Sequence, residues 1–501
     1  MRTNQWKVLY FSTVFLFLSA CGGGGSGSIA PGQPPTPQPP SEPESNPPFE
    51  WELASPDALG IDSDQVQNAV SYAMQDGLYS QGILVVKDGK IVGEEYRGIG
   101  ENETRELKNY PGSRVLDESI ESFANRDETS LATSWSMAKS VTSLLFGIAQ
   151  GMDYFPEGLD ESASTYLTEW QNDVRESITI REILDMRSGL EPACYFNGWY
   201  VCDAAGAGAG GYFGAAEDQL TGCIYRNLAQ TNVPHPWYYN YGLVFERGHF
   251  MYSNCDTMIL GEIFFRATGK DIMTFAETHL FSELGIRAYW WRDSAEGGQA
   301  DGNYLAYCCI DATTRDFAKI GLLIMNDGQW QGKEIVPKSY IEQIKNITTD
   351  SVVSELGGSF SYGFQFWTLM PRDNCGAQKC FPTNTLYAAI GFDGQYIAMD
   401  FRNNLMVVRN SLYTARLNYS DDRKYYMNPS DEIASNYTLT APSFVSETNV
   451  GERFIISDFM SRLLGTEEAT AEQVPEASPS TDTDTTAEEA SPSTDTDTAA
   501  D

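Results

Sequence analysis

Runs of apolar residues at both ends of the central region have the length and spacing of β-strands. Near its start, residues 83–86 and 91–96 are rich in Ile, Leu and Val. Asp88-Gly89 lies between them and suits the positive φ angles of a two-residue turn, so this segment predicts a β-hairpin. Near its end, residues 395–400 and 405–408 repeat the pattern. Strands are therefore expected at both ends of the folded body.

Between these strand regions the apolar positions follow a helical spacing. Helices are predicted over four segments, residues 140–150, 180–186, 257–267 and 314–326. A last amphipathic segment, Arg453 to Leu464, can lie back across the sheet. The predicted fold is of the α/β class (α+β type): an antiparallel sheet formed by both ends of the body, flanked by helices, with a mostly helical lobe inserted between them. A cleft between two such lobes is a natural active site.

Composition divides the chain into four regions. Residues 1–21 are predicted to be an export signal, because basic residues precede an apolar run shorter than the roughly 20 residues of a membrane span. Residues 22–48 are rich in Gly, Ser and Pro and predict a linker. Residues 49–465 are the predicted folded body. Residues 466–501 form an acidic repeat with too little apolar content to fold.

The export signal ends in Leu18-Ser19-Ala20-Cys21, which resembles the lipobox of bacterial lipoproteins. The resemblance implies that Cys21 is acylated and becomes the mature N-terminus. The protein is then expected in the bacterial cell envelope, lipid-anchored at the outer membrane on its periplasmic side or at the cell surface. The linker would hold the folded body away from the bilayer.

The charge balance argues against one class of partner. The formal net charge is -36, from 33 basic and 69 acidic residues. A protein that binds nucleic acid needs a basic surface to displace counterions from phosphates, so nucleic acid is not an expected partner. The membrane, through Cys21, and a small-molecule substrate are the partners that we expect.

Eight cysteines follow Cys21, and in an oxidising periplasm an even number suggests disulfides. Eight cysteines allow 105 pairings, so the connectivity cannot be read from the sequence. Cys375–Cys380 and Cys194–Cys202 would close short loops and are the pairs that we predict. No Cys-x-x-Cys spacing occurs and the chain has only 3 histidines, so neither a metal site nor a cofactor is predicted.

The segment Ser134-Trp-Ser136-Met-Ala-Lys139 precedes a long apolar helix. If Ser136 lies at the helix N-terminus, Lys139 follows one turn later on the same face. Serine becomes a good nucleophile only when a base takes its proton. Lysine can be that base if burial or a neighbouring cation lowers its pKa from about 10.4 towards roughly 7–8. Taken alone, the tetrapeptide favours a capping serine followed by a solvated lysine.

Two further segments favour a catalytic role for Ser136 and Lys139 instead. Tyr252-Ser-Asn254 stands directly before another apolar helix, where a tyrosine can pass a proton to a leaving group. Gly391-Phe392-Asp-Gly394 leads directly into a predicted strand. Glycines beside an edge strand let a substrate approach the backbone closely.

In this order the three segments resemble those of the serine β-lactamase-like superfamily, in its class C and 6-aminohexanoate-dimer hydrolase branch. That branch has Ser-x-x-Lys, then Tyr-x-Asn, then a glycine-bearing strand where other members have Lys-Thr-Gly. Residues 183–190, 314–321 and 332–337 also resemble sequence segments that are typical of this branch. The likeness covers residues 49–464 and implies a β-lactamase/transpeptidase-like fold.

The resemblance assigns a role to each candidate residue. Ser136 would be the nucleophile, Lys139 its base and Tyr252 the acid and base for the leaving group and for water. Asn254 would hydrogen-bond within the site, and the backbone N–H groups of Ser136 and Phe392 would form the oxyanion hole. The third segment departs from the family pattern, because it lacks the cation that binds the carboxylate of a β-lactam. The expected function is hydrolysis of small amides or esters through an acyl-enzyme.

Other functions remain open. Within the same chemistry, the alternatives are a D-amino-acid peptidase or carboxypeptidase and a β-lactamase. A third possibility is a non-catalytic envelope lipoprotein that uses the fold for binding. A Ser-His-Asp triad is disfavoured, because the chain has no Gly-x-Ser-x-Gly elbow and each histidine is more typical of a structural position.

Overall fold

The computed structural model describes residues 48–109, 123–190, 218–228, 246–293, 302–347, 359–370, 385–412 and 453–465, together with a few two-residue strands between them. All of these residues belong to one compact unit that begins at Pro48.

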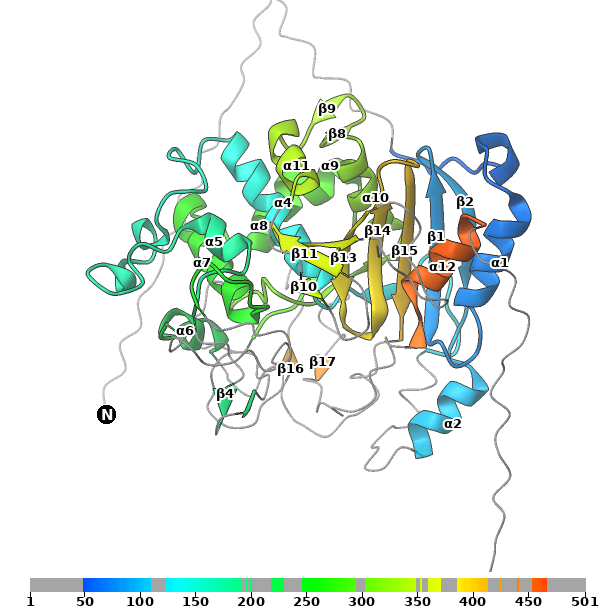
Figure 1. Ribbon diagram of the computed structural model, residues 1–501, viewed down its shortest axis with the longest axis horizontal. Helices are drawn as coiled ribbons and strands as arrows, with labels where there is room; N and C mark the ends of the chain where they lie inside the picture. The colour runs from blue at the N-terminus through cyan, green and yellow to red at the C-terminus, as the bar shows by residue number, and fades with distance from the viewer. Residues whose placement is uncertain are drawn as a thin grey trace, which may run out of the picture. The chain divides into compact units, whose positions relative to one another are not determined.

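An antiparallel eight-stranded sheet forms the centre of the unit, in the order β10-β11-β12-β13-β14-β15-β1-β2 (Figure 1). Strands from the start of the body thus lie beside strands from its end, which confirms the predicted sheet. The strands are β1 (Ser80–Lys87), β2 (Lys90–Tyr96), β10 (Val352–Val353), β11 (Ser359–Gly363), β12 (Phe366–Met370), β13 (Leu386–Gly391), β14 (Gln395–Asp400) and β15 (Leu405–Ser411).

The first hairpin forms where the sequence predicts it. Asp88 and Gly89 connect β1 to β2 with φ angles of 50° and 76°. Positive φ at both turn positions gives the twist that adjoining antiparallel strands require, and Asp-Gly tolerates it. On the other side of β1, β15 pairs with it over its whole length, so β1 is buried within the sheet.

Helices cover both faces of the sheet. Ile83 and Val85 point into a core cluster with α1 (Ser63–Ala73) and α12 (Ile456–Leu463), and Leu84 and Val86 point into the cluster on the opposite face. Successive side chains of a strand alternate between faces, so a strand that is apolar at every position needs cover on both sides. The last amphipathic segment therefore does lie on the sheet, next to α1 (Figure 1).

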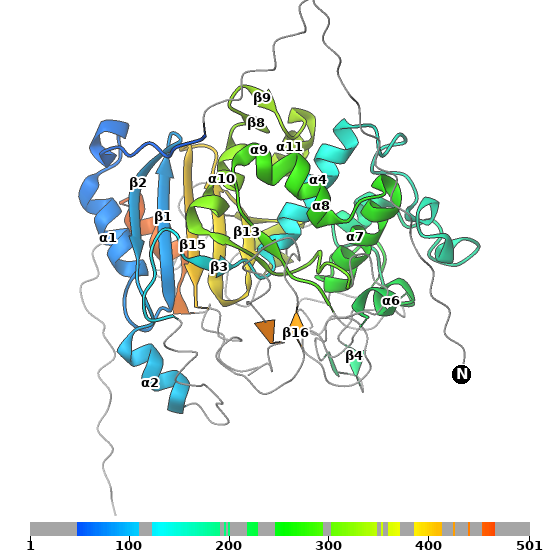
Figure 2. The ribbon, with the colours of Figure 1, turned by 180° about the vertical axis from the view of Figure 1, so that it is seen from behind.

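The opposite face carries the helical part of the chain, seen from behind in Figure 2. Close contact between sheet and helix is possible at Gly321, where a Cβ atom would lie 2.2 Å from the sulfur of Met406 on β15. The α-helices here are α4 (Met137–Gly151), α5 (Ile180–Leu184), α6 (Gln219–Ile224), α7 (Asn254–Thr268), α8 (Ile272–Ala276), α9 (Ser282–Leu284), α10 (Thr314–Met325) and α11 (Lys338–Lys345). Four of them correspond to the four predicted helices.

Several short elements were not predicted from the sequence. A three-stranded sheet has the order β3-β7-β6, from β3 (Leu131–Thr133), β7 (Ile310–Thr313) and β6 (Tyr289–Trp290). Other short elements are α2 (Glu101–Asn109), β4 (Tyr195–Phe196), β5 (Trp199–Tyr200), β8 (Gln329–Trp330), β9 (Lys333–Glu334), β16 (Lys424–Tyr425), β17 (Leu439–Thr440), and the helical turns η1 (Pro56–Leu59), η2 (Ala163–Thr165), η3 (Thr168–Trp170), η5 (Glu277–Phe281) and η6 (Phe392–Gly394). The β3-β7 pairing matters most, because β3 leads directly into Ser134–Ser136.

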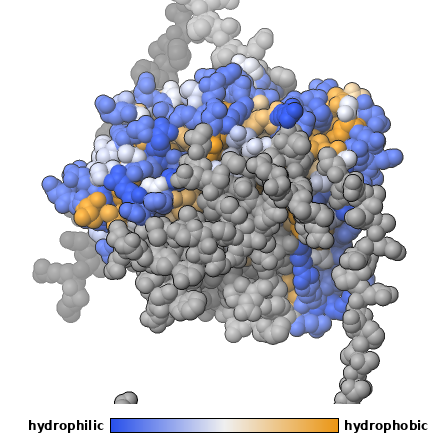
Figure 3. Space-filling model, viewed as in Figure 1, coloured by the Kyte–Doolittle hydropathy of each residue, from blue (hydrophilic) through white to orange (hydrophobic). Residues whose placement is uncertain are grey.

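Hydrophilic side chains predominate on the described part of the face in Figure 3. Within the described ranges, no helix is both long enough and apolar enough to cross a membrane.

Candidate active site

Ser136 stands at the junction between β3 and α4. The chain leaves β3 after Thr133, passes through Ser134 and Trp135, and enters α4 immediately after Ser136. Ser136 is partly exposed, whereas Lys139, one helical turn later, is only 1% exposed. Lys139 Nζ lies 3.1 Å from Ser136 Oγ. The spacing predicted from the sequence thus brings the amine to the hydroxyl.

The amine of Lys139 has two further partners, both neutral. Nζ donates to Asn254 Oδ1 at 2.8 Å and to the carbonyl oxygen of Tyr307 at 2.9 Å. None of the described carboxylates forms an ion pair with it. Burial lowers the pKa of Lys139 well below its ordinary value, because the charged form loses its hydration.

This environment is suited to a general base. A neutral amine keeps two hydrogens, which Asn254 and Tyr307 accept, and its lone pair then points to the Ser136 hydroxyl. The arrangement allows Lys139 to take the proton of Ser136 when the oxygen attacks a carbonyl carbon.

Tyr252 lies on the other side of the same two groups. Its side chain hydrogen-bonds Ser136, and the centre of its ring is 4.8 Å from Lys139 Nζ. Burial raises the pKa of Tyr252 above its ordinary value, so the phenol is protonated near neutral pH. The structure thus brings together Ser136, Lys139, Tyr252 and Asn254, although they come from two helices that are more than one hundred residues apart.

The loop after α5 holds Tyr252 and Asn254 in place. Met186 O accepts the N–H of Met251, and Met186 Sδ accepts the N–H of Ser253 at 3.2 Å. Two residues later, Ser188 Oγ donates to Asp256 Oδ1 at 2.9 Å. Met186 and Ser188 thus support the start of α7.

The third predicted segment lies against the nucleophile segment. Strand β13 ends at Gly391, where a Cβ atom would lie only 2.2 Å from the carbonyl oxygen of Ser134. Phe392 follows, and its ring meets that of Trp135 at 5.5 Å between centroids. The close approach requires a residue without a side chain at this point. The role of the Phe392 N–H in an oxyanion hole stays a prediction.

Asp393 and Arg409 fix the turn that contains Phe392 and Gly394. Asp393 Oδ2 accepts from Trp135 Nε1 at 3.0 Å. Arg409 on β15 is fully buried and donates to the carbonyl oxygens of Asp393 and Gly394. The end of β13 is therefore tied both to the sheet behind it and to the nucleophile segment in front of it.

An aromatic wall borders the site and could not be found from the sequence. Trp367 on β12 stacks on Tyr252 with ring centroids 5.3 Å apart. Tyr362 packs against both rings, and Phe250 packs against Trp367 and Tyr362. Trp367 and Tyr252 are partly exposed. They offer an apolar surface next to Ser136, assembled from β12 and from the segment that precedes α7.

Among the residues that the structure describes there are two disulfides that sequence spacing did not indicate. Cys223 bonds to Cys255, which joins α6 to α7, and Cys308 bonds to its neighbour Cys309. The two predicted pairs, Cys194–Cys202 and Cys375–Cys380, lie outside the described residues, as does Cys21. Of the eight cysteines after Cys21, these four are not part of the two observed bonds.

Neither a histidine base nor a metal is indicated among the described residues. The partners of Ser136 there are Lys139 and Tyr252, whereas the ring of His279 packs against Phe275. No group of three or more potential metal ligands occurs in the same part of the chain.

With this geometry established, the family can be assigned. Residues 66–426 match the family model described as Beta-lactamase. The chain belongs to the beta-lactamase family. Membership in the beta-lactamase family and the described site together support an activity of the serine hydrolase type.

Individual relatives are distant. A stretch of 170 residues is 25% identical to the 6-aminohexanoate-dimer hydrolase of Paenarthrobacter ureafaciens, and it covers 33% of this chain and 39% of that protein. The match therefore spans less than half of the relative's length. Among solved structures, a 6-aminohexanoate-dimer hydrolase candidate from Bacillus anthracis is 19% identical with a TM-score of 0.49 over 75% of this chain and 84% of its own. A penicillin-binding protein homologue from Pyrococcus abyssi is 16% identical with a TM-score of 0.47 over 70% and 74%.

Proposed function

We propose that this member of the beta-lactamase family hydrolyses amide or ester bonds of small substrates through an acyl-enzyme on Ser136. One observation carries the proposal: a buried amine, depressed in pKa and without an ionic partner among the described residues, lies 3.1 Å from a partly exposed serine hydroxyl. A surface lysine that follows a helix-capping serine would have neither the burial nor the neutral acceptors.

The first half-reaction begins at Ser136. Its Oγ attacks the carbonyl carbon of the substrate while Lys139 takes the hydroxyl proton. The carbonyl oxygen becomes an oxyanion, for which the N–H groups of Ser136 and Phe392 are the proposed donors. When the tetrahedral intermediate collapses, the phenol of Tyr252 gives its proton to the departing amine or alcohol and regains one from Lys139.

Water completes the cycle. It attacks the ester carbon of the acyl-enzyme and gives up a proton to the Lys139–Tyr252 pair. The bond to Ser136 Oγ then breaks, and the serine oxygen takes that proton back. Each proton that leaves Ser136 or water thus returns to a leaving group, and the free enzyme is restored.

The choice of substrate rests on weaker support. The name of the curated relative concerns a linear amide dimer, and we propose linear amides and simple esters as the substrate class. The third segment has no Lys-Thr-Gly, so the cation that would hold the carboxylate of a β-lactam is missing from that motif. The aromatic wall of Tyr252 and Trp367 favours apolar acyl groups.

Ser136→Ala tests the proposal directly. A fluorophosphonate probe should label the wild-type protein at Ser136, and Ser136→Ala should lose both labelling and turnover. Ser140→Ala is the matched control, since Ser140 lies one turn further along α4 and donates to Gln365 O away from the nucleophile. The substrate panel contains nitrophenyl esters, the linear 6-aminohexanoate dimer, D-peptides and a cephalosporin. A folded wild-type protein that the probe does not label would favour the non-catalytic binding lipoprotein instead.

A further inference from the structure

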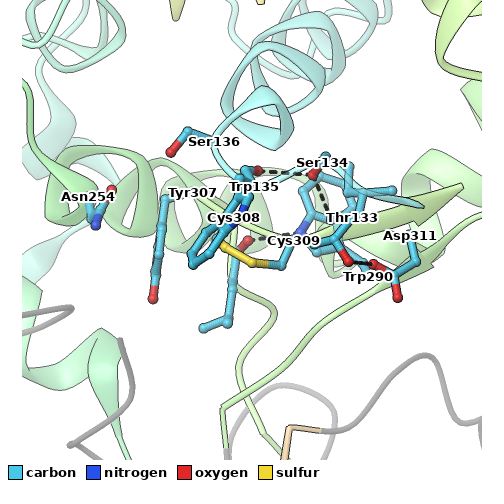
Figure 4. Close-up of a disulfide and its surroundings, with 12 residues drawn as sticks. Thr133, Ser134, Trp135, Ser136, Asn254, Trp290, Tyr307, Cys308, Cys309 and Asp311 are labelled. Carbon is cyan, nitrogen blue, oxygen red and sulfur yellow. Dashed lines mark hydrogen bonds between the residues drawn. A yellow bond between two sulfur atoms is a disulfide. The ribbon is translucent and has the colours of Figure 1, made fainter. Parts of the chain in front are cut away.

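Cys308 and Cys309 form a disulfide between neighbouring residues, directly behind the candidate active site (Figure 4). Both are buried, at 1% and 2% exposure. A bond between adjacent cysteines closes no loop of chain, so it contributes little by restricting the unfolded state. Its effect is local: the ring that it closes limits the conformations of the two residues and of the peptide between them.

Tyr307, Cys309 and Ile310 make the contacts that hold the proposed base and the nucleophile segment. The carbonyl oxygen of Tyr307 accepts from Lys139 Nζ at 2.9 Å. The N–H of Cys309 donates to the carbonyl oxygen of Trp135 at 3.1 Å. Ile310 then exchanges two hydrogen bonds with Ser134, one through its N–H and one through its carbonyl oxygen. Figure 4 shows the disulfide between Tyr307 and the Ser134 contact.

The backbone at this contact needs such support. Trp135 and Cys309 have φ angles of 48° and 69°, in the left-handed region that residues with a side chain rarely adopt. Residues held there are strained and persist only where the surroundings determine their conformation. Trp135 immediately precedes Ser136, so its conformation sets the direction in which the serine leaves the loop.

We propose that the Cys308–Cys309 disulfide is a positioning element of the active site, which holds the Tyr307 carbonyl against Lys139 and the Cys309 N–H against the nucleophile segment. The inference rests on the proposed function. Neither cysteine touches the reacting atoms, and the disulfide acts through the backbone of residues 307–310.

The test removes the disulfide and measures the effect on Lys139 through kcat and its pH dependence. In Cys308→Ala/Cys309→Ala the segment can relax and admit water to Lys139. We expect kcat for a nitrophenyl ester to fall about tenfold or more with little change in KM, since small displacements of a catalytic group are costly. We also expect the acid limb of the kcat profile to move to higher pH, because a hydrated ammonium gives up its proton less readily.

Ser143→Ala is the control for a merely structural effect. Ser143 is buried two turns further along α4 and hydrogen-bonds Tyr340. This variant should lower the melting temperature and leave the acid limb in place. If the double cysteine variant shows only the same loss of stability, with unchanged kcat and acid limb, the disulfide has no positioning role.

Two measurements keep the proposal testable if the double variant does not fold. Peptide mapping of the unreduced protein should show the 308–309 peptide two hydrogens lighter than its dithiol form, and free thiols there would overturn the proposal. Dithiothreitol should slow fluorophosphonate labelling of the wild type, as two electrons and two protons pass from its thiols to the disulfide. The same slowing is expected in Cys223→Ala/Cys255→Ala, and labelling that is unaffected there, once peptide mapping shows the 308–309 bond reduced, speaks against the proposal. Failure of the proposed function is separate, because it shows as an unlabelled, inactive wild type.

Discussion

At the scale of single residues, the chemistry depends on the surroundings of Lys139 more than on its identity. Its side chain is 1% exposed, and its partners are the uncharged Ser136, Asn254 and Tyr307. Removing water disfavours the ammonium, and no carboxylate among the described residues pairs with it to offset that effect. The same lysine on a solvated helix face would stay protonated and could not act as a base.

Lys139→Met should therefore lower kcat/KM by about 10²–10⁴, the usual contribution of a positioned base. The apolar side chain is close in length and keeps the site filled, so stability should change little or rise. In the wild type, kcat/KM should rise with pH as Lys139 loses its proton, with a midpoint well below its ordinary pKa. Lys319→Met is the control, since Lys319 on α10 donates to Asp316 on the same helix and to the carbonyl oxygen of Gly285, which follows α9. Full activity in Lys139→Met would contradict its assignment as the base.

At the scale of elements, the site depends on the contact between the end of β13 and the segment that joins β3 to α4. Gly391 allows the two backbones to meet, and Asp393 accepts a hydrogen bond from the indole of Trp135. The oxyanion hole that we propose needs one N–H group from each side of this contact, Ser136 and Phe392. The geometry of the proposed oxyanion hole therefore depends on how the end of β13 packs against the start of α4.

Asp393→Ala should loosen this contact. The indole N–H of Trp135 loses this buried acceptor, which costs about 1–3 kcal/mol, and alanine fits the φ of 62° at this position less well than aspartate does. We expect a lower free energy of unfolding and a fall in kcat. Asp393→Asn keeps both an acceptor oxygen and a side chain that tolerates this conformation, so it should retain most of both. Equal losses in the two variants would show that the negative charge matters instead of the hydrogen bond.

At the scale of the whole molecule, buried carboxyl groups make stability depend on pH. Burial raises the pKa of Asp256 to about 7 and that of Asp185 to about 6, above the ordinary 3.8. Between about pH 4 and pH 7 the folded protein keeps protons that the unfolded chain has lost. The free energy of unfolding should therefore fall as the pH rises through this window.

Asp256→Asn should flatten this profile, because an amide carries no charge at any of these pH values and still accepts from Ser188. The variant should gain stability over the wild type progressively from about pH 4 to pH 7, as measured by chemical denaturation at several pH values. Asp160→Asn is the control of opposite sign, since Arg181 lowers the pKa of Asp160 below the ordinary 3.8. That variant should lose relative stability as the pH rises to about 4–5 and change little from there to pH 7. A wild-type stability that does not decrease across the window would contradict the raised pKa of Asp256.

The sequence predicted local structure better than it predicted contacts between residues that are far apart along the chain. The Asp88-Gly89 hairpin, the four helices and the Ser136–Lys139 spacing follow from turn chemistry and helical periodicity, which act over a few residues. The aromatic wall and the disulfides did not follow, because no spacing along the chain connects Trp367 with Tyr252 or Cys223 with Cys255.

The amino-acid sequence by itself determined which groups are available: a serine and a lysine one helical turn apart, a tyrosine before a second apolar helix, and glycines before a strand. Only the tertiary structure decided that the lysine is dehydrated and that the tyrosine hydrogen-bonds Ser136. It also decided that Tyr307 contacts Lys139 and that Cys309 contacts the nucleophile segment. The reason is physical. Hydrogen bonds and burial depend on distances in space, and these are set by how the sheet and the helices pack together.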